Sequence, residues 1–323
     1  MVRILNIEPR GYTQPAREVL QGLGELREAE LGREELLAQL ADCEVLITRL
    51  AHYIDGEVLD AGPRLKAVVT ATTGLDHIDL EAAAQRGVEV LSLRGEWEFL
   101  ESVSATAEHT WGLLLALVRR IPAAHASVLA GGWDRDSFKG RELMGRRLGC
   151  VGLGRLGRKV AAYALAFGME VCAHDPAPLK WVEGVERLDT LEQLLAASEV
   201  LSLHPPLNEQ TRGMIGPREL ALLPRGSVVI NTARGGLIDE AALLQALQSG
   251  HLAGAALDVL ANEPAGGQAA SPLIAYAREH SNLIITPHVA GATDESMAKT
   301  ELFMARKLEA FLRAKGLLEE GGA

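Results

Sequence analysis

The chain is poor in cysteine and has no long hydrophobic run. Its three cysteines, Cys43, Cys150 and Cys172, are widely spaced, and neither a CxxC nor an HExxH spacing occurs. Two of them fall on expected buried strands, so we predict reduced thiols in the core rather than disulfides or metal ligands. The apolar runs stay far below the roughly 18 residues that a membrane span needs. We therefore expect no metal site and no association with a membrane.

Positive charge is scarce relative to negative charge. The 323 residues include 32 Lys and Arg against 43 Asp and Glu, which gives a formal net charge of −11. Because nucleic acids and anionic membrane surfaces bind clustered cations, this balance argues against both as partners. Residues 1–7 form a short apolar pattern without a basic segment or a cleavage site, which favours a cytoplasmic protein.

What the chain does contain is a regular alternation of strand and helix patterns. A chain of this length with 48% hydrophobic residues can bury two cores. Expected strands lie at 2–7, 45–48, 67–70 and 88–92 and, after a long helix at 104–120, at 148–151, 170–174, 200–203, 228–231, 255–258 and 283–286. This order predicts two α/β domains with parallel sheets. The last helix, at 294–315, has no place in the second sheet, so the expected domains are 1–101 with 292–323, and 102–291.

A glycine-rich segment joins the strand at 148–151 to the next expected helix. It reads Gly152-Leu153-Gly154-Arg155-Leu156-Gly157. Glycines at this spacing permit a tight turn, close approach of the backbone to a pyrophosphate, and close packing of helix on strand. Asp175 follows about 20 residues further on, where a carboxylate accepts hydrogen bonds from ribose hydroxyls and repels a 2′-phosphate. The pattern predicts a bound dinucleotide and favours NAD over NADP, and the alternative is a glycine turn that binds nothing.

Three loops after later strands carry polar side chains suited to catalysis. They are Asn231-Thr232-Ala233-Arg234-Gly235-Gly236, the segment 258–264 with Glu263, and Thr286-Pro287-His288-Val289-Ala290-Gly291. Open α/β sheets bind their ligands at the carboxyl ends of the strands. We therefore expect an arginine, a glutamate and a histidine to converge at one sheet edge.

These motifs, together with Ala107-Glu108-His109 and His204-Pro205-Pro206-Leu207, resemble the D-isomer-specific 2-hydroxyacid dehydrogenase family over nearly the whole chain. The resemblance implies a doubly wound Rossmann domain that binds NAD and a smaller, discontinuous, flavodoxin-like substrate domain. It implies an oxidoreductase that transfers a hydride between nicotinamide and a small D-2-hydroxy acid or 2-oxo acid. It also implies a homodimer with the apolar segment 121–138, including Trp133, as its arm, although a surface flap would have the same composition.

By the same resemblance, Arg234 binds the substrate carboxylate, His288 supplies or removes the hydroxyl proton, and Glu263 orients His288. A guanidinium grips a carboxylate through two hydrogen bonds. A carboxylate beside a histidine favours the imidazolium and keeps a proton available for carbonyl reduction. The alternative interpretation makes Arg234 a surface cation in a glycine-rich turn and Glu263 a solvated acid.

The expected ligand contacts extend beyond these three residues. The cofactor-binding residues are Gly152, Gly154, Arg155, Leu156, Gly157, Asp175, His204, Pro205, Thr232, Ala233, Asp258 and Gly291. By the resemblance Asp258 meets the nicotinamide amide, although an acid at a strand end also caps turns. Substrate contacts are expected from Thr72, Thr73, Gly74 and Arg94 besides Arg234, since backbone N–H groups of the loop 72–76 suit a carboxylate. His109 is expected to cap or to pack near the long helix.

Substrate identity is the least constrained feature. The segment 140–145 resembles the D-3-phosphoglycerate dehydrogenase branch, but Thr70 stands where that branch presents a phosphate-binding arginine, and we expect no regulatory C-terminal domain. Residues 94–101 replace the family's usual short loop. In one interpretation Arg94 binds a second anionic group and Trp97 covers the cleft; in the other the segment is a surface or dimer element. The functional alternatives are a D-3-phosphoglycerate dehydrogenase proper and a dinucleotide-sensing protein similar to the family's corepressors.

Overall fold

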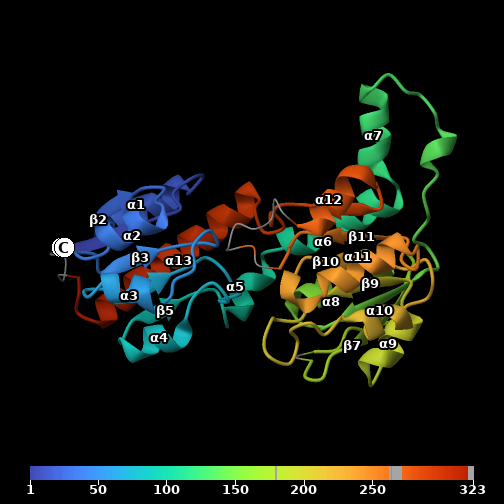
Figure 1. The fold of residues 1–323 in the computed structure, drawn as a ribbon. Coiled ribbons are helices and arrows are strands. Elements are labelled where there is room, and N and C mark those ends of the chain that lie inside the picture. Colours follow the sequence, from blue (N-terminus) through green and yellow to red (C-terminus); the bar gives the residue numbers. More distant parts are fainter. Residues whose placement is uncertain (179, 262, 264–270, 319–323) are drawn as a thin grey trace. The chain divides into compact units, whose positions relative to one another are not determined.

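The computed structural model describes residues 1–178, 180–261, 263 and 271–318, and it consists of two compact α/β units (Figure 1). Unit 1 comprises Met1–Val103 and Ala292–Ala323, and unit 2 comprises Ser104–Gly291. Each unit contains one sheet, and every strand pairing among the described residues is parallel. This confirms the predicted α/β class with two parallel sheets.

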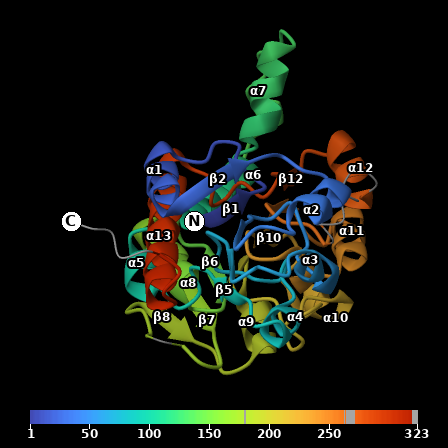
Figure 2. The ribbon, with the colours of Figure 1, turned by 90° about the vertical axis from the view of Figure 1, so that its left-hand side faces the viewer.

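The sheet of unit 1 has the strand order β2-β1-β3-β4-β5, which is the flavodoxin-like order. Its strands are β1 (Val2–Asn6), β2 (Gly24–Glu28), β3 (Val45–Ile47), β4 (Ala67–Val69) and β5 (Glu89–Leu91). Its helices are α1 (Gln14–Leu23), α2 (Arg33–Gln39), α3 (Gly56–Ala61), α4 (Leu80–Gln85), α5 (Trp97–Glu101) and α13 (Asp294–Ala314). Figure 2 shows α1 and α13 on one side of this sheet and α2 and α3 on the other.

Both faces of the unit 1 sheet are buried because side chains alternate along each strand. Ile4 belongs to the cluster under α1 and α13, whereas its neighbour Leu5 belongs to the cluster under α2, α3 and α4. The three-residue strands β3 and β4 are buried at every position, as expected for central parallel strands. Helices on both faces therefore fix the loops at the carboxyl ends of these strands.

The sheet of unit 2 has the order β12-β11-β10-β9-β6-β7-β8. Strands β6 to β8 extend toward one edge and strands β9 to β12 toward the other, so the strand order switches between β6 and β9. Its strands are β6 (Arg147–Val151), β7 (Glu170–His174), β8 (Val185–Arg187), β9 (Val200–Leu203), β10 (Val228–Asn231), β11 (Gly254–Leu257) and β12 (Leu283–Ile285). Its α-helices are α6 (Ala105–Val118), α7 (Ile121–Leu129), α8 (Arg155–Ala166), α9 (Leu191–Ala197), α10 (Pro217–Leu222), α11 (Glu240–Gln248) and α12 (Pro272–Glu279), and its 3-10 helices are η1 (Asp136–Phe138) and η2 (Gly235–Leu237).

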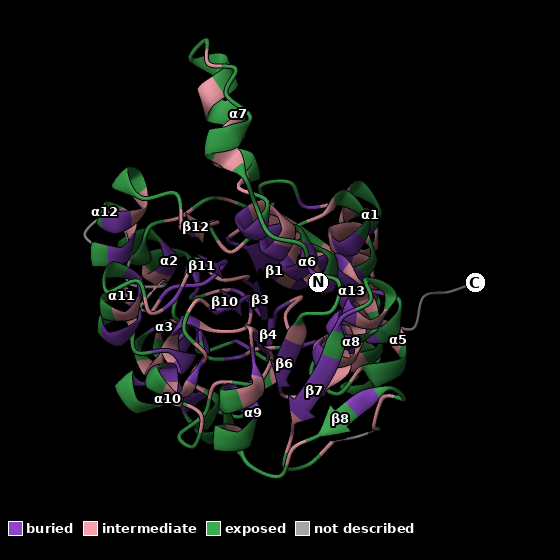
Figure 3. Ribbon diagram, turned by 90° about the vertical axis from the view of Figure 1, so that its right-hand side faces the viewer, coloured by how far each residue is buried: buried purple, intermediate pink, exposed green. Residues whose placement is uncertain are grey.

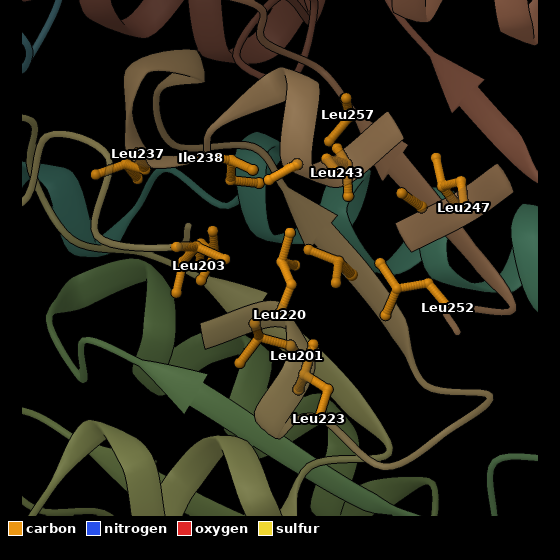
Figure 4. Close-up of a cluster of buried hydrophobic side chains, with 14 of the residues drawn as sticks. Leu201, Leu203, Leu220, Leu223, Leu237, Ile238, Leu243, Leu247, Leu252 and Leu257 are labelled. Carbon is orange, nitrogen blue, oxygen red and sulfur yellow. The ribbon is translucent and has the colours of Figure 1, made fainter. Parts of the chain in front are cut away.

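Two hydrophobic clusters hold this second sheet. One of them includes Leu201 and Leu203 of β9 together with Leu243 and Leu247 of α11 (Figure 4). The other contains side chains of helices α6 and α8 together with Leu148 and Cys150 of β6. All three cysteines are buried and outside disulfides, and burial raises the pKa of the Cys43 thiol to about 11. The sheet is thus covered on both faces, and in doubly wound sheets ligands bind at the carboxyl ends of the strands.

Several elements differ from the sequence-based expectation. Helix α1 and strands β2 and β8 were not predicted. Strand β2 gives the first sheet five strands rather than four, and β8 gives the second sheet seven rather than six. The segment 94–101, expected as a loop, is helical from Trp97 to Glu101. Both missed strands lie at sheet edges and expose polar side chains, so they lack the apolar pattern of a buried strand.

Helix α7 stands apart from both clusters of unit 2. None of its residues is buried, in contrast to strands β6 and β7 (Figure 3). Within the described ranges no single helix is long and apolar enough to cross a membrane. The helical stretch Trp97–Val118 and helix α7 pass that test together by length and composition, with a bend of 63° between them.

Candidate active site

The glycine turn between β6 and α8 is closely packed: a side chain would be strained at Gly152 and would clash with the backbone at Gly157. Gly152 has φ +84°, and a Cβ there would lie 3.2 Å from the carbonyl carbon of His204 and the nitrogen of Pro205. A Cβ on Gly157 would lie 2.1 Å from the Gly152 carbonyl oxygen. A Cβ on Gly154 would meet nothing within 4 Å, so the backbone at this point is open to a ligand.

Asp175 is fixed beside this turn at the end of β7. Its carboxylate accepts hydrogen bonds from the backbone N–H of Leu153 at 2.7 Å and of Ala177 at 2.9 Å, one on each oxygen. A carboxylate oxygen has two lone pairs, so each retains acceptor capacity for a ribose hydroxyl. The bond to Leu153 makes Asp175 part of the turn as well as a candidate ligand contact.

His204 borders the same turn from the end of β9. Its Nε2 lies 2.9 Å from the Ser202 hydroxyl, while its Nδ1 is buried and has no hydrogen-bond partner among the described residues. Burial lowers the pKa of His204 to about 4, so the ring is neutral at physiological pH. A buried polar atom without a partner is costly unless a ligand or water satisfies it. The open backbone at Gly154, the Asp175 carboxylate and this nitrogen together fit a bound dinucleotide.

The loop after β10 presents Arg234. Asn231 shapes the loop, since its Nδ2 donates to the Arg234 carbonyl at 2.9 Å and its Oδ1 accepts from the Ala233 N–H at 3.0 Å. The next residue, Gly235, is pressed against the loop after β11: a Cβ there would lie 2.0 Å from the carbonyl carbon of Leu260. Asn231 begins the motif that contains Arg234, but its side chain was not among the predicted site residues.

His288 and Glu263 form a short polar contact in the site. The Nδ1 of His288 lies 2.5 Å from Oε2 of Glu263, and the two side chains are 26% and 22% exposed. Glu263 also accepts a hydrogen bond from the Leu260 N–H, which ties it to its own loop. With Nδ1 occupied by the carboxylate, Nε2 is the nitrogen that can exchange a proton with a substrate. Of the predicted loop 258–264, residues 262 and 264 lie outside the described residues.

Asp258 holds the backbone around His288. His288 has φ +54°, a left-handed conformation that is uncommon outside glycine. The Asp258 carboxylate, 1% exposed, accepts from the Thr286 hydroxyl at 2.5 Å and from the N–H groups of Val289 at 3.0 Å and Ala290 at 2.8 Å. These bonds fix the residues on both sides of His288. The contact between Asp258 and the nicotinamide remains a prediction.

His109 joins this network from helix α6. Its Nε2 lies 3.0 Å from the Thr286 hydroxyl and 3.3 Å from Oδ1 of Asp258. His109 was expected only to cap or pack near helix α6, yet it supports the loop that carries His288. The motif Ala107-Glu108-His109 was the available sequence signal for a role of His109. Its partners Thr286 and Asp258 lie too far along the chain to be inferred from that motif.

The other predicted residues occupy the loops where the sequence placed them. Arg155 and Leu156 begin helix α8, and the Thr232 hydroxyl lies 2.7 Å from that of Thr110 on α6. Gly291 ends unit 2, and Pro205 borders the glycine turn. Thr72, Thr73, Gly74 and Arg94 belong to unit 1. In the part of the chain that the structure describes, no group of three His, Cys, Asp or Glu side chains could hold a metal ion.

The chain matches known protein sequences over most of its length. The family model of the D-isomer specific 2-hydroxyacid dehydrogenase NAD binding domain matches residues 111–290. A D-3-phosphoglycerate dehydrogenase of Methanocaldococcus jannaschii is 38% identical over 319 residues, covering 98% of this chain and 58% of that protein. The enzyme of the same name from Rattus norvegicus is 41% identical over 306 residues, covering 93% and 55%. This chain therefore spans a little over half the length of these relatives.

Solved structures of similar proteins match along both chains. The TT0316 protein from Thermus thermophilus superposes with a TM-score of 0.85 at 35% identity, covering 97% of each chain. D-lactate dehydrogenase from Aquifex aeolicus, solved with NAD and lactic acid, superposes with a TM-score of 0.83 at 29% identity, covering 99% of this chain and 100% of that one. The sequence comparison and the structural comparison thus both find dehydrogenases among the proteins similar to this chain.

Proposed function

Since the chain belongs to the D-isomer specific 2-hydroxyacid dehydrogenase family, as its motifs predicted, we propose that it interconverts a 2-oxo acid and a D-2-hydroxy acid with NAD as cofactor. The observation that carries this proposal is the contact of 2.5 Å between His288 and Glu263. It lies at the carboxyl edge of a dinucleotide-binding sheet, and Arg234 is on the neighbouring loop.

Three side chains would perform the acid–base and binding steps. Arg234 would grip the substrate carboxylate with its planar guanidinium, which fixes the orientation of the carbonyl carbon. His288 would donate a proton from Nε2 to the carbonyl oxygen during reduction and accept it back during oxidation. Glu263 would hold the ring through Nδ1 and compensate the positive charge of the imidazolium.

Unit 2 would hold the cofactor, and in unit 1 the loop Thr72–Gly74 is the proposed substrate contact. The glycine turn would bind the pyrophosphate through backbone N–H groups, Asp175 would accept the ribose hydroxyls, and Nδ1 of His204 would gain a partner. Bound NADH would supply the hydride, which the protein positions but does not itself provide.

The activity is tested by following NADH oxidation with a panel of 2-oxo acids. The panel contains glyoxylate, pyruvate, hydroxypyruvate, phosphohydroxypyruvate, 2-oxoglutarate and branched and aromatic 2-oxo acids, with NADPH in parallel. We expect turnover of at least one acid and a preference for NADH. Binding of NADH without turnover of any acid would contradict the proposal and favour a dinucleotide-sensing protein.

A D-3-phosphoglycerate dehydrogenase proper is the second candidate, because the relatives at 38% and 41% identity carry that name. The buried Thr70, at the position where that branch presents an arginine, weighs against it. Oxidation of 3-phosphoglycerate by NAD, compared with oxidation of other D-2-hydroxy acids, separates the two.

Asp175→Ala is expected to weaken NADH binding by about 10- to 100-fold and NADPH binding far less. The variant removes both the acceptor for the ribose hydroxyls and the charge that repels a 2′-phosphate. Fluorescence titration with each nucleotide measures the two affinities. Asp175→Asn is the matched control, because it keeps an oxygen for the Leu153 N–H while removing the charge. Equal losses for NADH and NADPH would place the selectivity elsewhere.

We also propose a homodimer that uses helix α7 and the segment after it. Leu129 is 75% exposed and Trp133 is 90% exposed, and large exposed apolar side chains gathered on one segment favour a protein interface. Light scattering is expected to give about twice the chain mass of 34.6 kDa. Trp133→Glu is expected to shift the protein toward the monomer, and a monomeric wild-type protein would contradict the proposal.

A further inference from the structure

A tight turn after β5 presents the side chain of Arg94. The Glu96 N–H donates to the Leu93 carbonyl at 3.2 Å, and Gly95 has φ +88°. This is the arrangement of a type II turn, with Arg94 and Gly95 as its two central residues. The backbone conformation that Gly95 supplies is unfavourable for other residues, so the turn at Arg94 is specified by the sequence.

The turn is anchored to helix α13 within unit 1. Lys307 forms an ion pair with Glu96 and donates to the Ser92 carbonyl at 2.8 Å, so it bridges both ends of the turn. In the following helix α5, the Phe99 ring stacks on Phe303 with 4.0 Å between centroids. The backbone that carries Arg94 is therefore held from both sides rather than hanging as an open loop.

The same turn lies against the loop that we propose for substrate binding. The Leu93 N–H donates to the Thr72 carbonyl at 3.0 Å, and the Thr70 N–H donates to the Leu91 carbonyl at 2.9 Å. These bonds continue the pairing of β4 with β5 beyond the strand ends. Arg94 is thus one residue away from a direct backbone contact with Thr72, within reach of a ligand bound at Thr72–Gly74.

Neither of two nearby positions supplies an available cation. Thr70 is fully buried, and its hydroxyl lies 3.1 Å from that of Thr72. Arg49, after β3, is bound at 2.8 Å by Glu301, a buried carboxylate, and stacks over the Tyr12 ring. Arg94 is exposed and forms no ion pair with any described residue.

We propose that Arg94 is a specificity-determining residue that binds a second anionic group at the far end of the substrate. The substrate is then a 2-oxo acid whose side chain ends in a carboxylate or a phosphate, either of which suits the guanidinium fork. This inference depends on the proposed function: NADH and a proton reduce the ketone to the D-alcohol, and Arg94 binds without taking part in bond changes.

The test compares 2-oxo acids in pairs that differ in a terminal anion. The pairs are phosphohydroxypyruvate with hydroxypyruvate, and 2-oxoglutarate with 2-oxopentanoate. We expect kcat/KM to be about 10- to 100-fold higher for the charged member of at least one pair, because charge-assisted hydrogen bonds have that strength. If the charged acid is preferred only in the first pair, the substrate carries a terminal phosphate. If it is preferred only in the second pair, the substrate carries a terminal carboxylate.

Arg94→Met is expected to abolish this preference by raising KM for the charged acid, with NADH affinity and turnover of the uncharged acid within about twofold of wild type. Arg94→Lys keeps the charge without the fork, so it should retain part of the preference. Arg10→Met is the matched control, because Arg10 is exposed on the loop after β1, two strands from β4 in the same sheet.

Each other outcome overturns the inference in a recognisable way. Equal activity on charged and uncharged acids leaves the proposed function intact and removes the role of Arg94. Equal losses on both acids in Arg94→Met would make the residue structural, and loss of the preference in Arg10→Met would move the anion site to β1. Absence of turnover with every acid would overturn the proposed function itself.

Discussion

His288→Ala is expected to lower kcat by about two to four orders of magnitude, the usual scale for loss of a general acid–base group. The His288 ring is fixed by Glu263 at 2.5 Å and presents only one nitrogen to a substrate. Stopped-flow reduction of the preferred 2-oxo acid by NADH measures the loss, and NADH titration by fluorescence is expected to give an unchanged affinity.

His52→Ala is the control for the loss of an imidazole as such, because His52 belongs to unit 1 and to none of the motifs. Glu263→Gln should fall between wild type and His288→Ala, since it keeps a hydrogen bond to Nδ1 but not the negative charge. Wild-type turnover in His288→Ala would refute the acid–base assignment.

Gly235→Ala is expected to lower kcat/KM by about 100-fold or more, although it adds only a methyl group. That Cβ would lie 2.0 Å from the carbonyl carbon of Leu260 and 2.2 Å from its oxygen, so two backbone segments must separate. One segment carries Arg234 and the other carries Glu263. Displacement of reacting groups by about 1 Å is enough for a loss of this size. Steady-state kinetics with the preferred 2-oxo acid measures the effect.

Gly236→Ala is the matched control because it adds the same methyl group one residue later. Its Cβ would meet side-chain atoms of Leu207 at 3.1 and 3.2 Å and of Arg212 at 3.6 Å, which can move. Near-normal activity is expected. A Gly235→Ala enzyme as active as Gly236→Ala would show that the two loops need not pack closely for catalysis.

The sequence predicted the elements whose signals are local. The glycine turn, the buried strands of both sheets and the carboxyl-end loops with Arg234 and His288 each depend on a short pattern. Parallel sheets bring the loops of successive strands to one edge, so convergence of these loops could be expected. The short distance between Nδ1 of His288 and Glu263 could not be predicted, because it depends on how two loops pack against each other.

The features that the sequence did not predict depend on partners far along the chain. Helix α5 is anchored by α13, through Phe99 on Phe303 and Glu96 with Lys307. His109 of helix α6 acquires its role from its contact with Thr286, which follows strand β12 in the same unit. Edge strands such as β2 pair on one side only and expose charged residues, so no apolar alternation identifies them.

The stereochemistry of the product is the most direct measure of the proposed reaction. The preferred 2-oxo acid is reduced with NADH, and the 2-hydroxy acid is analysed by chiral chromatography. We expect the D-hydroxy acid as the sole product, formed in equal amount to the NADH consumed. Formation of the L-acid, a racemic product or no hydroxy acid would contradict the proposed function.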